Sequence, residues 1–227
     1  MRYINKSIQD LFSDGKDLYF STSNRRNPKK YRKDVKYLKY REGVLETVTL
    51  DAYFKARYGE NYERIMAYFQ DCSTSRAIGH DGSVYVCHYQ ESIICKFDSN
   101  GSLVRKYEEM GRMDTIYDIA VHGNSIWCAY PTSHTIKRFS LEDGSLEVSL
   151  SEEGSKMDTG TIFTFPESLS LHGDTLFVSD MGNRRVCSVD LSTLEIDTHL
   201  QVDGPVFQYE RLGNEEFVRL VSKLCLV

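Results

Sequence analysis

The most distinctive candidate for chemistry is a run of cations near the N-terminal end. Between Asn24 and Arg41, nine Lys and Arg side chains occur against Asp34 alone, in a chain whose net charge is −5. Three tyrosines are interleaved with them: Tyr31, Tyr37 and Tyr40. A basic segment in an otherwise acidic chain predicts either an anionic partner or a solvated loop. Phosphate contacts and base stacking would also suit single-stranded nucleic acid, but the acidic remainder would repel a long polyanion.

Other reactive side chains are scattered and form no known catalytic motif. The chain lacks the GxSxG, HExxH and P-loop patterns. Its six cysteines show no CxxC spacing, which favours buried, reduced thiols. We therefore expect no cofactor, and any site must come from side chains that the fold brings together.

Strand-like segments recur along the chain, each after a short polar turn. An aromatic residue marks the same position in five copies: Tyr19, Tyr85, Trp127, Phe177 and Phe217. The intervals of 66, 42, 50 and 40 residues are close to the length of a four-stranded blade once insertions are allowed. Both faces of each copy are largely apolar, as expected for a blade packed between two others. The pattern predicts an all-β fold, a closed β-propeller of about five four-stranded blades, as a single domain over residues 1–227.

The copies also predict the order of strands within a blade. Three of them align without a gap: Val84–Asp98, Ile126–Ser140 and Leu176–Asp190. In each, an inner strand precedes the aromatic and an outer strand follows the copy. The last copy ends after its third strand, so we expect Met1–Ile4 to supply the missing outer strand and close the ring. Six blades are the alternative if Asn5–Lys16 or Asp51–Arg76 holds a degenerate copy.

One blade resembles the NHL repeat. Residues 165–186 read FPESLSLHGDTLFVSDMGNRRV, which follows the NHL pattern of proline, apolar strand, glycine turn, apolar strand, Asp, Gly-Asn, Arg and an apolar residue. The two preceding copies carry His88 and Tyr130 in place of Asp180. The resemblance implies an NHL-like propeller, a group that includes scaffolds, sensors, RNA binders and a few enzymes. It also implies that Asp180 and Arg184 brace a turn.

Three enlarged connections are predicted to emerge on one face of the propeller. They are the basic segment, the connection Asp51–Arg76 and the connection Ser151–Thr164. Within the second, apolar residues at spacings of 4, 4, 3 and 4 predict a helical insertion at about 51–70 between blades one and two: Phe54, Tyr58, Tyr62, Ile65 and Phe69. We expect this helix to pack on the propeller rather than bind a partner, and Gly59 could divide it in two.

We place the candidate ligand-binding site on this decorated face, near the central opening, because loops vary freely there over a rigid frame. Its predicted members come from the basic loop, the starts of inner strands and the ends of second strands: Arg25, Arg26, Lys29, Lys30, Arg76, His88, Asp118, Tyr130, Glu167 and Asp180. Three histidines occupy equivalent positions in different blades: His80, His122 and His172. Such positions are spread around a ring, too far apart to share a metal ion, so we expect no metal site there.

Three functions fit these features. The favoured one is a non-catalytic scaffold that binds a protein partner or an anionic ligand through the decorated face. The second is a metal-dependent hydrolase similar to the calcium-dependent lactonase propellers, with oxygen ligands from Asp118, Glu167, Asp180 and Asp203. The third is binding of single-stranded RNA through the basic loop.

Composition bounds the setting of the protein. Hydrophobic residues make up 41 % and charged residues 27 % of the chain, as in ordinary globular proteins. No apolar run has the length of a signal peptide or a membrane span. We therefore expect a cytoplasmic protein without a membrane partner.

Overall fold

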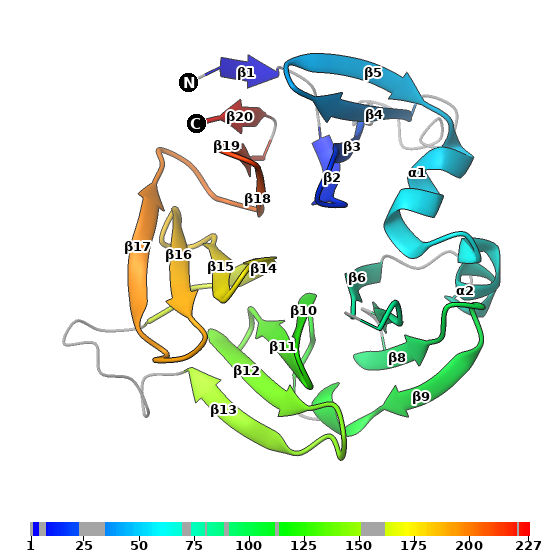
Figure 1. The fold of residues 1–227 in the computed structure, drawn as a ribbon. Helices are drawn as coiled ribbons and strands as arrows, with labels where there is room; N and C mark the ends of the chain where they lie inside the picture. Colours follow the sequence, from blue (N-terminus) through cyan, green and yellow to red (C-terminus); the bar gives the residue numbers. More distant parts are fainter. Residues whose placement is uncertain are drawn as a thin grey trace.

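The chain folds into a ring of five four-stranded antiparallel sheets, a five-bladed β-propeller (Figure 1). This computed structural model describes residues 2–4, 8–22, 35–69, 74–79, 81–88, 91–111, 114–150, 162–221 and 223–227. The predicted fold class and blade number are confirmed, and the six-bladed alternative is wrong. Ile8–Ser13, within the segment Asn5–Lys16 that was considered for a sixth blade, forms the inner strand of blade one.

Each blade runs from an inner strand at the axis to an outer strand at the rim. Blade one contains β2 (Ile8–Ser13), β3 (Leu18–Thr22), β4 (Lys36–Arg41) and β5 (Val44–Val48). Blade two contains β6 (Thr74–Ile78), β7 (Val84–His88), β8 (Ile93–Phe97) and β9 (Leu103–Tyr107). Blade three contains β10 (Asp118–His122), β11 (Ser125–Tyr130), β12 (Thr135–Ser140) and β13 (Leu146–Leu150). Blade four contains β14 (Pro166–His172), β15 (Thr175–Asp180), β16 (Arg185–Asp190) and β17 (Ile196–Gln201).

Blade five combines both ends of the chain. It contains β18 (Gln208–Leu212), β19 (Glu215–Arg219), β20 (Leu224–Leu226) and, as its outer strand, β1 (Arg2–Ile4). Strand β1 pairs antiparallel with β20, with Tyr3 opposite Cys225. The expected closure of the ring by the N-terminal segment is therefore confirmed.

Glycines close the tight hairpins between the first two strands of three blades. Gly123, Gly173 and Gly213 have φ values of 57°, 57° and 60°, in the left-handed region that favours glycine. These turns hold the inner strand against the second strand in a fixed register, which places equivalent residues of the blades at equal heights along the axis.

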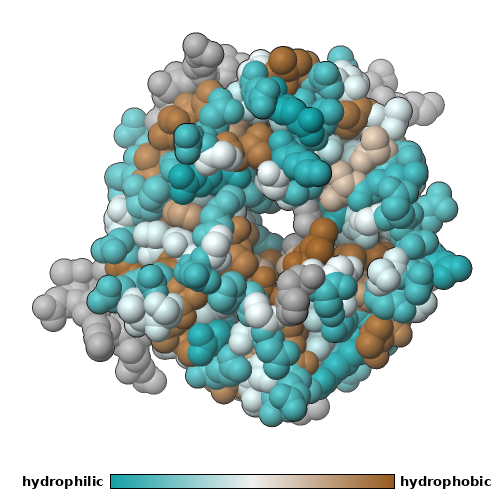
Figure 2. Space-filling model, in the orientation of Figure 1, coloured by the Kyte–Doolittle hydropathy of each residue, from teal (hydrophilic) through white to brown (hydrophobic). Residues whose placement is uncertain are grey.

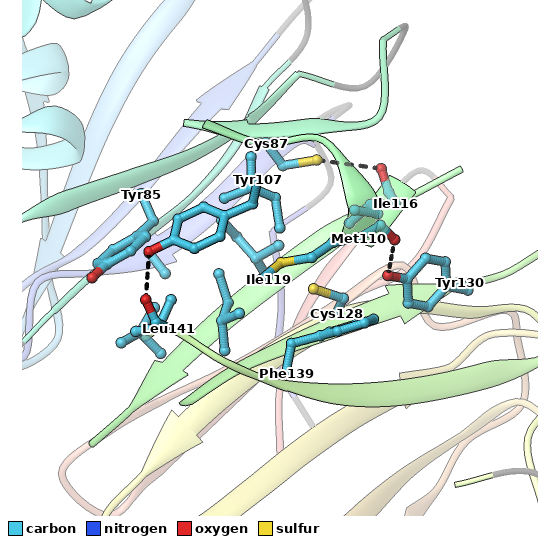
Figure 3. Packing of buried hydrophobic residues seen from close by; sticks show 14 residues of the cluster. Tyr85, Cys87, Tyr107, Met110, Ile116, Ile119, Cys128, Tyr130, Phe139 and Leu141 are labelled. Carbon is cyan, nitrogen blue, oxygen red and sulfur yellow. Dashed lines mark hydrogen bonds between the residues drawn. The ribbon is translucent and has the colours of Figure 1, made fainter. Parts of the chain in front are cut away.

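The hydrophobic core lies between the blades rather than at the centre of the ring. Figure 3 shows the cluster between blades two and three, where Tyr85 and Cys87 of one blade face Ile119 and Cys128 of the next. Buried hydroxyls in this layer find backbone partners, since Tyr107 donates to the carbonyl of Leu141 at 3.0 Å. The apolar second strands are thus covered on both faces, as their sequence pattern requires.

The helical insertion fills the junction between blades one and two. It forms two helices, α1 (Leu50–Tyr58) and α2 (Tyr62–Phe69), separated at Gly59, whose φ is 86°. Tyr53 of α1 packs with Phe12 and Tyr19 of blade one, and α2 packs against blade two through Ile65 and Phe69. The side chains of the apolar stripe therefore pack against the propeller, as expected. None of the described helices is long and apolar enough to cross a membrane.

Candidate functional site: the axial channel and the insertion-face cavity

A channel runs along the axis of the propeller, and Figure 2 shows its opening at the centre of the ring. Its wall carries five polar residues, one from the inner strand of each blade. On the second strand of the same blade, each of them pairs with the residue that lies two positions after the marker aromatic. We call these five the waist ring: Asp10, Ser75, Asp118, Ser168 and Gln208. Two cavities lie along the channel, one on each side of this ring. Asp10, Asp118, Ser168 and Gln208 line both cavities, and Ser75 lines one of them.

The larger cavity opens on the face of the helical insertion, and we call it the insertion-face cavity. Its volume is about 590 Å³. The starts of the inner strands supply polar groups, whereas α1 and the neighbouring loops supply aromatic rings, including Tyr53, Phe54, Tyr117 and Phe207. A concave site of this size, with aromatic side chains and several polar groups in its walls, has the volume of a ligand pocket.

Helix α1 contributes a buried ion pair to the channel. Its Arg57, only 9 % exposed, pairs with Asp10 of the waist ring and also donates to the Tyr58 hydroxyl at 3.0 Å. The Tyr53 hydroxyl donates to Asp10 at 2.7 Å. Burial opposes ionisation of Asp10, but the Arg57 guanidinium outweighs it and holds the pKa of this carboxyl below its usual range. The ion pair holds α1 against the inner strand β2 and fixes one positive and one negative charge in the channel wall.

Asp118 joins three neighbouring blades. It accepts hydrogen bonds from the Ser75 hydroxyl of blade two, from its own neighbour Ile119 N at 3.0 Å and from Leu169 N of blade four at 2.8 Å. Burial raises the pKa of Asp118 to about 6, despite these donors. The carboxylate satisfies inner-strand N–H groups that face the channel and have no strand partner on that side.

Glu167 and Arg219 lie in the same cavity and interact electrostatically. Burial raises the pKa of Glu167, and the positive charge of Arg219 opposes this shift. Arg219 donates to the carbonyl of Ile8 at 3.3 Å, and its guanidinium lies 5.1 Å from the ring centre of Phe207. The lining of this cavity therefore carries both signs of charge.

Two amide atoms of the cavity lining are buried without a hydrogen-bond partner among the described residues. They are Nε2 of Gln9 and Oε1 of Gln208. The two side chains come from the inner strands β2 and β18, which contact each other. One donor and one acceptor are thus left unsatisfied in the lining of the same cavity, at a cost of about 1–3 kcal/mol each.

Among the sequence-predicted site residues whose side chains the structure describes, Asp118 and Glu167 line the cavity. Arg76 lies in β6, but its side chain is outside the described residues. The four cations of the basic loop also fall outside the described residues: Arg25, Arg26, Lys29 and Lys30. The ligand-binding role of these residues stays a prediction.

The other three predicted residues, at the ends of second strands, are packed away from the cavity. His88 accepts from Glu91 N at 3.2 Å and stacks on Phe69. Tyr130 is fully buried and donates to the Met110 carbonyl at 2.5 Å (Figure 3). These three side chains pack against neighbouring elements, whereas the inner strands and α1 supply most of the channel lining that the structure describes.

Asp180 braces a turn, but with a different arginine from the one that the NHL resemblance implied. It is fully buried and accepts from Thr164 N at 2.7 Å and from Arg185 Nε at 2.8 Å. Arg184 instead occupies the left-handed corner of the turn, with φ 56°. The strand begins one residue later, so the side chain of Arg185 is the one turned toward Asp180.

Sequence reasoning missed four members of the waist ring and the helix residue Arg57. The ring could have been found by aligning the inner strands of all five copies and asking which position is polar in every one. Arg57 gave no such signal, because its place depends on how α1 docks.

A metal site finds little support in these side chains. Among the described residues, no group of three or more His, Cys, Asp or Glu could hold a metal ion. Asp118 and Asp180 have oxygens that accept from protein donors, and Asp203 lies outside both cavity linings. We derive no metal-dependent step.

Comparison with known proteins identifies the fold. The sequence matches no protein-family model and no curated protein. A streptogramin B lyase structure superposes with a TM-score of 0.59 at 13 % identity, over 99 % of this chain and 95 % of that one. A catalytically inactive virginiamycin B lyase from Staphylococcus aureus with quinupristin gives 0.57 at 14 % identity, over 96 % and 78 %. A chain of the nidogen/laminin complex gives 0.53 at 14 %, over 95 % and 73 %.

These similar structures are β-propellers with different functions, a lyase in two cases and a protein complex in the third. At such identities the likeness shows the fold alone. The function has to be argued from the channel and its cavities.

Proposed function

We propose that this propeller is a binding protein that holds a peptide segment of a protein partner in the insertion-face cavity. The proposal is supported by the shape of the site, a cavity of about 590 Å³ with aromatic walls and both signs of charge. It is also supported by the packing of the blades, which fixes the five inner strands and so prepares the site before a ligand arrives.

The observation that carries the proposal is the pair of unsatisfied amide atoms, Gln9 Nε2 and Gln208 Oε1. A peptide group offers one C=O acceptor and one N–H donor, which complements this donor and this acceptor. Buried polar atoms without partners destabilise a fold, so their presence in a cavity wall favours a role in ligand recognition.

The test separates binding from folding. In Gln208→Leu and Gln9→Leu the side chains keep a similar volume but lose the unsatisfied atoms. We expect both variants to be at least as stable as the unmodified protein, because about 1–3 kcal/mol of desolvation cost is removed. Peptides selected from a random display library against the unmodified protein should bind these variants about tenfold more weakly or worse in calorimetry.

Glu195→Gln is the matched control, because Glu195 is exposed in a rim turn of blade four. It should bind the selected peptides like the unmodified protein. The proposal would be contradicted if the library yields no binder, or if Gln208→Leu lowers the melting temperature and leaves peptide affinity unchanged. The latter result would make Gln208 a structural residue.

A further inference from the structure

Among the described residues, three carboxyl groups line the insertion-face cavity, and two of them are held by protein donors. Asp10 pairs with Arg57, and Asp118 accepts hydrogen bonds from three donors. The third, Glu167, forms neither a hydrogen bond nor an ion pair with any residue that the structure describes. The cavity therefore contains a carboxylate whose acceptor capacity is not used by the described protein groups.

A β-bulge places Glu167 in the wall of the cavity. In the pairing of β14 with β15, Pro166 lies opposite Asp180 and the next pair joins Ser168 to Ser179. Glu167 is the extra residue between these pairs and has no partner on β15. A bulge of this kind re-aims the side chain of its extra residue, and bulges are frequent next to binding sites. Glu167 accordingly lines the insertion-face cavity.

Strand β2 carries a second bulge at the same level of blade one. Ile8 and Asp10 pair with β3, and Gln9 between them has no partner on that strand. Like Glu167, Gln9 directly precedes a waist-ring residue and lines the insertion-face cavity. Its Nε2 is one of the two unsatisfied amide atoms, and Oε1 of Gln208 is the other. The lining thus offers a donor, a neutral acceptor and a carboxylate, which match a peptide group and an adjacent cation.

The electrostatics of Glu167 favour a cation beside it. Burial raises the pKa of Glu167, the positive charge of Arg219 opposes this shift, and the negative charge of Asp118 adds to it. Burying an ionised carboxylate without hydrogen-bond donors is unfavourable, and a charged donor bound next to it offsets this cost. Arg219 is not that donor, because its guanidinium bonds the carbonyl of Ile8 and lies over the ring of Phe207.

Two aromatic residues flank Glu167 along the ring of blades. Tyr117 and Phe207 directly precede the waist-ring residues of blades three and five, as Glu167 does in blade four, and the inner strands of these blades contact β14. Both are half-buried, line the insertion-face cavity and lie outside the apolar clusters between the described blades. Aromatic faces pack on the alkyl stem of a Lys or Arg side chain and attract its cation.

We propose that the insertion-face cavity selects peptides with a lysine or arginine side chain, whose cation binds Glu167 and whose alkyl stem lies beside Tyr117 and Phe207. The inference rests on the proposed function and names the class of peptide that the site accepts. In this arrangement Gln9 and Gln208 bind one peptide group, and Glu167 specifies the side chain next to it.

The test uses four bead-bound libraries of nonapeptides, acetylated and amidated at their ends. The central residue is fixed as lysine, arginine, norleucine or glutamate, and the other positions are random among uncharged residues. Norleucine keeps the alkyl stem of lysine and lacks its ammonium group. Fluorescently labelled unmodified protein should bind about tenfold more beads of at least one basic library than of the norleucine or glutamate library.

Glu167→Gln keeps the size of the side chain and removes its charge. It should weaken binding of a selected basic peptide about tenfold or more in calorimetry and change the affinity of the matching norleucine peptide little. Glu195→Gln is the control for net charge, because Glu195 is exposed, and it should bind both peptides like the unmodified protein. If Glu167→Gln does not fold by circular dichroism, Glu167→Ala takes its place in the same comparison.

Equal binding of the basic and norleucine libraries would overturn the inference, and so would a basic preference that persists without Glu167 or is lost in Glu195→Gln. These results differ from failure of the proposed function. If peptides without a basic residue bind and lose affinity in Gln9→Leu and Gln208→Leu, peptide binding stands and only the basic specificity is wrong. Absence of binders in all four libraries contradicts both.

Discussion

Asp118 shows how a single side chain serves both the fold and the channel. It satisfies two inner-strand N–H groups from blades three and four and accepts the Ser75 hydroxyl from blade two. Its raised pKa shows that burial disfavours the charged form more than these donors favour it. The ionised carboxylate is therefore buried at an electrostatic cost. Because its pKa differs from the ordinary value, its titration should change the free energy of unfolding with pH.

We predict that Asp118 makes the protein more stable as the pH falls from 7 to 5. Its pKa is about 6 in the folded protein against 3.8 for the ordinary group, so the native state binds the proton first. The contribution, on the order of 3 kcal/mol, is fully present below the unfolded value and is lost as the pH rises through 6.

The measurement is urea unfolding of the unmodified protein and of Asp118→Asn at several pH values. The difference in the free energy of unfolding, unmodified protein minus variant, should increase from pH 7 to pH 5, whether this difference is positive or negative at pH 7. Glu167 also gains a proton as the pH falls, and the charge of Asp118 contributes to its raised pKa, so the two proteins are compared in a Glu167→Gln background that removes this second titration. Parallel curves would show that Asp118 titrates at an ordinary pKa.

At the scale of elements, the helical insertion between blades one and two packs against both blades. Thr49 caps α1 by accepting from Ala52 N at 3.2 Å, and the chain turns at Gly59 into α2. The apolar spacing predicted these helices, since their stripe packs on blade two. The same spacing could not predict the Arg57 contact with Asp10, because a charged residue on a helix is indistinguishable from a solvated one until its partner strand is placed.

The basic loop connects β3, which ends at Thr22, to β4, which begins at Lys36. We predict that its cations bind an anionic partner and add little to stability. If these charges are solvated, changing six of them to serine should shift the melting temperature only slightly, since surface charges rarely stabilise a fold: Arg25, Arg26, Lys29, Lys30, Arg32 and Lys33. Retention on heparin should fall sharply in this variant, and affinity of the unmodified protein should drop steeply with added salt.

Lys16→Ser is the control for this experiment, because Lys16 is an exposed cation in the turn that follows β2, at the other end of the inner strands. It should leave heparin retention nearly unchanged. If the unmodified protein ignores both heparin and single-stranded RNA at about 50 mM salt, the loop is only a solvated hairpin tip. Tight binding of RNA but not heparin would instead favour the nucleic-acid alternative.

For the whole molecule, the sequence predicted the architecture much better than the site. The marker aromatics and hairpin turns repeat in every blade, so blade number and strand order followed from alignment. The site depends on which side chain of each inner strand reaches the axis, and the inner strand of blade one was not recognised. Without β2 the alignment lacked Asp10, and the polar position shared by the five inner strands stayed hidden.

The last prediction concerns closure, which ties the ends of the chain into one blade. Strand β1 covers the edge of β20, with Arg2, Tyr3 and Ile4 opposite Leu226, Cys225 and Leu224. Replacing residues 1–5 by a Gly/Ser segment of equal length should remove this pairing without shortening the chain. Loss of about three backbone hydrogen bonds at about 1 kcal/mol each corresponds to roughly 6–12 °C in a domain of this size. The exposed edge of β20 should also promote aggregation, measurable by light scattering during the melt. An unchanged melting temperature would show that β1 is a dispensable strand and that the ring is held by its blade interfaces alone.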